Sequence, residues 1–416
     1  MEKLAFIPLV VCSLILSPSL LPGQTDTVPE KQTIAMELYE GPDITAKTSF
    51  GNCQWFYPLD QPKEALLEQP DYKSDKLYYY AAQYGDANDN IYTIVLDESG
   101  GSGTGYDTLY VDQDNDNRID STKEKFSFKL GTTSQATPVR VKLTVSAGGK
   151  KIPYCFDFTA FPYKDENNPI EKVHANARDS SIFVGQASFG GKQYKIALAD
   201  LDSNGLFNDI EQGLFKGDRF FVDLNGDGQF RRPPSGEEES FPYGKYTRIS
   251  GNWYSIQAAP DGTTIEISPA EPQLGTVSAP KNMVAAELRS DVQFQRLQFS
   301  DGSAQAIAGT YTLATVELSA VDNEKRTWQT RGVFRSDPPE VTILPDAETR
   351  LSDVLPLQVS IEPTGETPSD VVQLEAKITG SNGGSYRCPR ADKFEGTFEV
   401  QDQQGKVVAS GKFEPG

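Results

Sequence analysis

The chain has little histidine, little basic charge and few cysteines. His174 is the only histidine among 416 residues, so any Ser-His-Asp or Cys-His relay would depend on it, and a metal site built from several histidines is excluded. Lys and Arg number 39 against 59 Asp and Glu, which gives a net charge of −20. Nucleic acids and anionic membranes are bound through Lys and Arg, so this balance disfavours both as partners and favours cations.

Long apolar runs are also scarce, and the one that stands out, Leu4–Leu16, lies at the N-terminus. It is too short for a membrane-spanning helix. Its charged start and the small residues after it are typical of a signal peptide, which we place at residues 1–23. The bulky Val11 before Cys12 argues against a lipid-modified cysteine. We therefore expect a secreted, periplasmic or cell-surface protein without a transmembrane segment.

Three cysteines, Cys53, Cys155 and Cys388, lie beyond this segment, and an odd number cannot all pair within one chain. Cys53 and Cys155 are both in the N-terminal part of the chain. The sequence leaves two interpretations open, a disulfide between these two residues or three free thiols.

Strand patterns dominate the rest of the chain. Residues 91–96, 139–145 and 311–318 are rich in apolar and β-branched residues, partly in alternation with polar ones, as in half-buried antiparallel strands. Glycine (35 residues) and proline (27 residues) interrupt these runs at the spacing of turns. We expect one short helix near 62–67. The sequence as a whole predicts a mostly β fold.

Two loop-rich segments, 161–179 and 268–281, divide the chain. We predict a first β module over 24–170, a second over 171–275 and a C-terminal domain over 283–416. The last part has about eight short strands separated by turns, which is typical of an immunoglobulin-like or fibronectin-like β-sandwich.

The first two modules contain an internal repeat. Three pairs of segments align in the same order, namely 92–96 with 194–198, 107–116 with 218–227, and 124–126 with 239–241. A duplicated β module, made of strands joined by acidic loops, is the simplest explanation.

The acidic loops follow the pattern of a calcium loop. Calcium takes six to eight oxygens, which a tight loop supplies from side chains at positions 1, 3 and 5, a carbonyl at position 7 and a carboxylate at position 12. Position 6 turns sharply and favours Gly or Asn, and position 8 carries an apolar anchor.

Three runs fit this pattern to different extents. The run Asp200–Glu211 fits throughout. The run that starts at Asp112 fits through position 9, and its acid comes at position 13. The run that starts at Asp223 fits through position 8 and has no acid at position 12. The predicted ligands, with carbonyls at position 7, are Asp112, Asp114, Asp116, Arg118, Asp120 and Glu124; Asp200, Asp202, Asn204, Leu206 and Glu211; and Asp223, Asn225, Asp227 and Gln229.

These loops resemble the calcium loops of EF-hand and dockerin modules and of thrombospondin type 3 repeats, over about 35 residues. The resemblance implies calcium ligation by the matching positions. A true EF-hand has a helix on each side of its loop, whereas β patterns precede all three loops here. The whole chain also resembles, loosely, uncharacterised exported bacterial proteins with such loops and a C-terminal β domain.

One further ligand follows from strand pairing. If 194–199 and 218–222 pair antiparallel, Asp218 lies beside the loop that begins at Asp200. Asp223 then lies at the other end of the hairpin, about 17 Å away. The second module should therefore hold two separate sites.

Two classes of function remain open. The first is a non-catalytic exported protein with structural calcium that acts in adhesion, at a surface or in ligand binding. The alternative is a secreted, glycosidase-like hydrolase with paired carboxylates, which needs no histidine. The glutamates at 237–239 are either an exposed charged turn or part of such a pair. The aromatic residues at 55–57 and 78–80 are either core or a platform for carbohydrate.

Overall fold

A computed structural model describes residues 31–39, 53–102, 105–131, 137–165, 168–210, 217–230, 239–321, 325–334, 338–363, 374–381, 383–387, 397–401 and 404–412. All regular structure in these residues is β, which confirms the mostly β fold. No helix in the described part of the chain is long and apolar enough to cross a membrane. The stretch near 62–67 is irregular and not helical. Residues 1–23, Cys388 and Glu211 lie outside the described residues.

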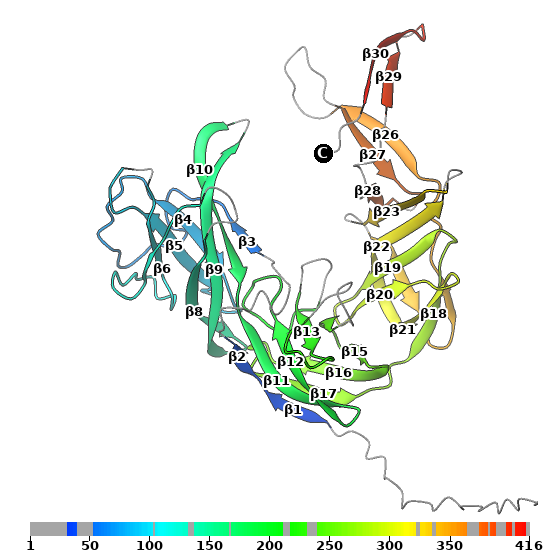
Figure 1. The fold of residues 1–416 in the computed structure, drawn as a ribbon, viewed down its shortest axis with the longest axis horizontal. Coiled ribbons are helices and arrows are strands. Elements are labelled where there is room, and N and C mark those ends of the chain that lie inside the picture. Colours follow the sequence, from blue (N-terminus) through cyan, green and yellow to red (C-terminus); the bar gives the residue numbers. More distant parts are fainter. Residues whose placement is uncertain are drawn as a thin grey trace, which may run out of the picture.

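Two antiparallel sheets are formed by the strands between residues 53 and 179. Their orders are β4-β5-β6-β7 and β3-β10-β9-β8 (Figure 1). Tyr80 packs against Phe158 between the sheets, with ring centroids 6.0 Å apart, and its hydroxyl donates to the Val173 carbonyl. The strands are β3 (Cys53–Phe56), β4 (Tyr78–Gln83), β5 (Ile91–Asp97), β6 (Thr108–Val111), β7 (Lys125–Ser127), β8 (Val139–Ala147), β9 (Lys150–Asp165) and β10 (Asn168–Asp179).

A second pair of sheets follows, with orders β14-β13-β12-β11-β2 and β1-β17-β16-β15. The hairpins at the aligned segments have the same register. Ile94 lies opposite Val111, and the aligned Ile196 lies opposite Val222. The strands are β1 (Gln32–Ala35), β2 (Glu37–Tyr39), β11 (Ile182–Phe189), β12 (Lys192–Ala199), β13 (Arg219–Val222), β14 (Ser240–Pro242), β15 (Tyr246–Ile249), β16 (Asn252–Ala258) and β17 (Thr264–Pro269).

The first described strands pair with strands from much later in the chain. β1 pairs with β17 and β2 with β11, while β10 continues past residue 170 as far as Asp179. The chain therefore contributes to the second pair of sheets before it builds the first. The boundaries at 170 and 275 remain predictions.

The remaining strands form the C-terminal part. β18, β21 and β25 make one sheet, and β20-β19-β22-β23-β28-β27-β26, with β24 on β22, make a larger one. The strands are β18 (Leu274–Ser278), β19 (Met283–Arg289), β20 (Phe294–Gln298), β21 (Ser303–Ile307), β22 (Gly309–Val321), β23 (Thr327–Val333), β24 (Glu340–Ile343), β25 (Glu348–Arg350), β26 (Gln358–Pro363), β27 (Leu374–Thr379), β28 (Ser385–Arg387), β29 (Thr397–Gln401) and β30 (Val407–Lys412).

The apolar cores follow this division. One continuous cluster contains buried residues from both of the first two pairs of sheets, such as Tyr154 and Phe207, whose rings pack edge to face with centroids 6.3 Å apart. A separate cluster around Leu288 and Val316 joins the β18-β21-β25 sheet to the larger C-terminal sheet. The immunoglobulin-like or fibronectin-like character of that part remains a prediction.

Cys53 and Cys155 are not joined by a disulfide, so the disulfide interpretation is wrong. They lie in β3 and β9, which flank β10 on opposite sides. Two strand spacings amount to about 9.6 Å, whereas a disulfide needs Cα atoms within about 7 Å.

Candidate metal sites

The three acidic loops each connect neighbouring strands of a sheet. The first joins β6 to β7, the second joins β12 to β13, and the third joins β13 to β14. The first residues of the first and third loops are held alike, since the N–H of Asp112 donates to the Thr93 carbonyl and that of Asp223 to the Lys195 carbonyl. Strand pairing therefore places position 1 of both loops in the same way.

All three loops share one backbone conformation. Positions 4 and 6 have positive φ in each, at 57° and 61° in the first, 58° and 82° in the second, and 79° and 75° in the third. Gly and Asn adopt this left-handed region most readily. They occupy five of these six positions, and Ser203 occupies the sixth. The local sequence therefore encodes two sharp reversals that curl each loop inward.

The first and eighth positions hold each loop in its curl. The Asp at position 1 accepts the backbone N–H of position 6 at 2.7–3.0 Å in all three loops. The position 8 side chains, Ile119, Phe207 and Phe230, are buried. The interior is thus lined with oxygens while the apolar anchor faces the core.

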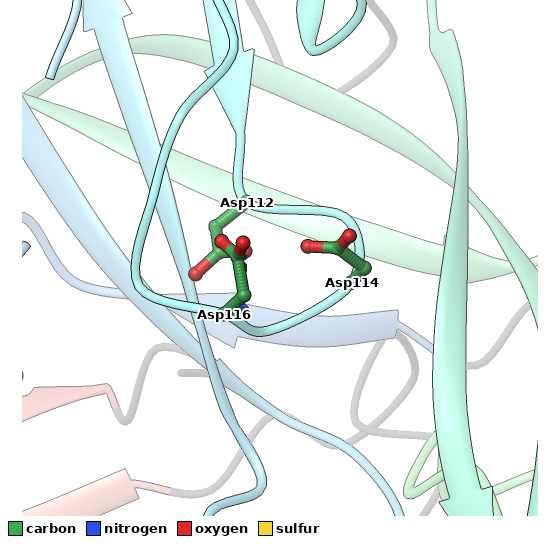
Figure 2. Close-up of side chains that lie close together, drawn as sticks. All are labelled: Asp112, Asp114 and Asp116. Carbon is green, nitrogen blue, oxygen red and sulfur yellow. Dashed lines mark hydrogen bonds between the residues drawn. The ribbon is translucent and has the colours of Figure 1, made fainter. Parts of the chain in front are cut away.

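The first loop gathers three carboxylates. Figure 2 shows Asp112, Asp114 and Asp116 directed toward the inside of the loop, and their oxygens lie within 4.8 Å of one another. Glu124 also faces this loop and accepts the backbone N–H groups of Gln113 (2.7 Å) and Asp120 (2.8 Å). Burial raises the pKa of Asp112 to about 7.

Two other residues predicted for this loop have different contacts. The Asp120 carboxylate accepts the Thr122 hydroxyl and N–H, which hold its pKa at about 2, and it lies outside the clustered group. The Arg118 guanidinium pairs with Glu68 at the surface, which leaves its carbonyl as the predicted contribution.

A polar cavity of about 700 Å³ adjoins the loop, lined in part by Asp114, Asp116 and Lys142. An ion held here would lie near solvent.

The second loop makes the more buried group. Asp200, Asp202 and Asp218 bring carboxylate oxygens within 4.8 Å of one another, and Asp200 and Asp218 are fully buried. Asp218 directly precedes β13 and lies beside the loop, as predicted from strand pairing. Asp200 accepts the hydroxyl of Tyr154 (3.0 Å) as well as the loop N–H groups. Asn204 accepts the Leu206 N–H within this loop. Ligation by Asn204 and by the Leu206 carbonyl stays a prediction.

No positive charge among the described residues offsets the carboxylates of this group. The buried Oδ1 atoms of Asp202 and Asp218 have no hydrogen-bond partner. No described Lys or Arg forms an ion pair with Asp200, Asp202 or Asp218. Burial raises the pKa of Asp200 and of Asp218 well above the ordinary range, and neighbouring carboxylates raise both further.

The third loop is completed by a residue that the sequence reasoning did not assign. Glu239, next to β14, is fully buried and accepts the backbone N–H groups of Leu224 (3.1 Å) and Asn225 (3.2 Å). Glu124 makes the corresponding contact to position 2 of the first loop. The interpretation of residues 237–239 as an exposed charged turn is therefore wrong for Glu239. Glu237 and Glu238 lie outside the described residues. The alignment of 124–126 with 239–241 could have identified Glu239, because it matches this residue with Glu124.

Two other members of the third loop, Asn225 and Asp227, lie closer to solvent. Asp223 is buried, whereas Asn225 and Asp227 accept the N–H groups of Asp227 and Gln229 near the surface. Asp218 directly precedes β13 and Asp223 directly follows it, so the second and third loops lie at opposite ends of this strand. The oxygens that this loop offers to a cation are therefore Asp223, Asn225, Asp227, the Gln229 carbonyl and Glu239.

Replacing Glu239 by Gln is expected to weaken calcium binding at the third loop by about tenfold, because an amide replaces a carboxylate that is able to bind through both oxygens. Isothermal titration of chelator-treated protein measures the loss. The matched control is Glu266→Gln on β17, which belongs to a different sheet from β13 and β14, the strands that the loop joins. Unchanged binding at every site in the Glu239 variant would contradict the assignment.

No family model, curated protein or solved structure matches this chain.

Proposed function

We propose that the protein is an exported, non-catalytic β protein that binds calcium at its three acidic loops. The calcium braces the strands, and the protein works in adhesion, at a surface or in ligand binding. The observation that carries this proposal is the buried group Asp200, Asp202 and Asp218. Carboxylates taken out of water without a counter-charge are costly. A divalent cation among them would provide the partner that the orphaned Oδ1 atoms lack.

The donor set favours calcium among divalent cations. Oxygens alone line the loops, and the described residues of all three contain no His or Cys, which suits a hard cation better than zinc. Calcium accepts the six to eight oxygens that a curled loop presents, whereas magnesium prefers octahedral geometry and keeps several waters. An extracellular module with a Kd of roughly 10⁻⁴–10⁻³ M would be loaded where calcium is millimolar.

A structural role follows from where the ligands come from. The second group joins the end of β12 to the start of β13, through Asp200 and Asp218. In the first loop Glu124, next to β7, faces a loop that leaves β6. A cation at either place would therefore link two strands of one sheet.

The carboxylate hydrolase is the weaker candidate. The other buried acids of the described residues have partners of their own. Glu287 pairs with Arg331, Asp261 pairs with Lys150, and Asp97 accepts the Lys73 and Ser74 N–H groups. The remaining buried carboxylates belong to the loops, apart from Glu98, which accepts the Gly105 N–H. Burial and the neighbouring Asp200 also raise the pKa of Asp179, which accepts the Ser181 N–H and lies beside the second loop.

Metal analysis tests the proposal directly. After chelation and dialysis against 2 mM calcium, the protein is expected to retain three calcium ions per chain, and the Asp218→Asn variant two. The exposed Asp291→Asn substitution serves as the charge-matched control and should leave three. Fewer than one ion per chain, or equal retention by wild type and Asp218→Asn, would refute calcium binding at this group.

A further inference from the structure

Three large aromatic side chains are exposed on a single sheet. Trp55 is 50% exposed, Tyr57 is 70% exposed and Tyr163 is 45% exposed, and they are the only strongly exposed Trp, Tyr or Phe side chains among the described residues. Trp55 belongs to β3, Tyr57 follows it directly, and Tyr163 belongs to β9. Single exposed apolar residues are ordinary, but a contiguous group of them marks a binding surface.

The rings form two contacting groups across three adjacent strands. His174 in β10 lies between two of them, stacked on Tyr163 with centroids 4.3 Å apart and edge-on to Tyr57 at 5.2 Å. Trp55 packs edge-on against Phe161 at 5.9 Å, and Phe161 lies opposite His174 in the sheet. Trp55, Tyr57, Tyr163 and His174 are hereafter called the aromatic row.

The opposite face of the same strands anchors the row. Phe56, Phe158 and Val173 alternate with the row residues and are buried in the main apolar core. Because side chains alternate between the faces of a strand, core packing on one side holds the backbone under the exposed rings on the other. The rings are therefore presented by a rigid surface.

Basic side chains flank the row. Lys172 and Arg178 occupy β10 at alternate positions with His174, and both are exposed. The carboxylate of Asp157, which shares this face, is paired with Arg140 at 2.9 Å. The described side chains of this face are thus locally basic on a chain whose net charge is −20.

We propose that the aromatic row binds an acidic carbohydrate. The C–H face of a pyranose ring packs on an aromatic ring, while hydroxyl groups of the sugar hydrogen-bond to the Tyr57 and Tyr163 hydroxyls and to His174. Lys172 and Arg178 are placed to meet carboxylate or sulfate groups of the ligand. The exposed residues that carry this proposal are aromatic or basic, which suits a ligand with sugar rings and negative charge. This inference goes beyond the calcium proposal and does not depend on it.

Binding is tested on the full protein in 2 mM calcium with two defined probes. These are hyaluronan octasaccharide, which is acidic, and chitohexaose, which is neutral. We expect saturable binding of hyaluronan by isothermal titration, with an affinity at least about tenfold above that for chitohexaose. Trp55→Ala should reduce hyaluronan affinity about tenfold or more, and Lys172→Ala combined with Arg178→Ala should reduce it and flatten its dependence on salt.

Controls separate this outcome from misfolding and from the calcium proposal. The exposed Leu344→Ala substitution in the C-terminal part should leave binding unchanged. Trp55→Ala should keep the wild-type calcium content and melting curve. Absent binding of hyaluronan, binding that Trp55→Ala does not weaken, or equal affinity for both probes would overturn the proposal. Self-association abolished by Trp55→Ala would also overturn it, by assigning the row to a second copy of the chain.

Discussion

Chelation of calcium is expected to lower the melting temperature of the first two pairs of sheets by roughly 15–30 °C. An ion that binds only the folded state stabilises it by about 2.7 kcal/mol per site when its concentration is 100 times Kd. Three sites then supply on the order of 8 kcal/mol, and each 1 kcal/mol shifts Tm by about 2–4 °C in a unit of this size. Differential scanning calorimetry in 10 mM calcium and in excess EDTA measures the change.

The C-terminal part provides an internal control. Its apolar cluster is separate from the one that adjoins the loops, and all three loops lie before residue 240. We therefore expect a second transition whose Tm is the same with calcium and with EDTA. A uniform shift of both transitions, or no shift of either, would contradict a structural role for calcium in the loops.

Asp218→Asn should separate the two roles of this carboxylate. With calcium the variant loses a ligand and is expected to melt several degrees below wild type. In EDTA it should melt at or above the wild-type temperature, because an amide relieves the repulsion among Asp200, Asp202 and Asp218. Lower stability of the variant under both conditions would indicate an ordinary packing role.

Calcium-free protein is expected to become less stable as the pH rises from 5 to 7.5. Burial raises the pKa of Asp112 to about 7 in the folded state, against about 3.9 in an unfolded chain. Between these values the folded state binds more protons than the unfolded state, so the free energy of unfolding falls with rising pH. The raised pKa values of Asp200 and Asp218 act in the same direction. For Asp112 alone the loss is on the order of 2 to 4 kcal/mol.

Calcium should remove this dependence, since the cation replaces the protons as the partner of the carboxylates. The Tm difference between calcium and EDTA is therefore expected to be large at pH 7.5 and small at pH 5. Thermal melts by circular dichroism at the two pH values, at constant ionic strength, measure it. Calcium-free protein that melts at a higher temperature at pH 7.5 than at pH 5 would show that these carboxylates are not held uncompensated.

The sequence by itself determined the fold class and the three curled loops. Alternation and turn spacing predicted the strands because burial on one face of a sheet requires a period of two. The loops were readable because a sharp turn at position 6, an Asp at position 1 and an apolar residue at position 8 all act within a dozen residues. Asp218 was also within reach, since a hairpin of known direction brings its ends together.

Only the tertiary structure decided which distant residues complete and surround these loops. Glu239 reaches the third loop because β14 pairs beside β13, and the expected helix near 62–67 and disulfide are absent for similarly non-local reasons. The aromatic segments illustrate the same limit, since Tyr80 is buried while Trp55 and Tyr57 are exposed. Composition cannot separate them, because the face that a strand buries depends on which sheet packs against it.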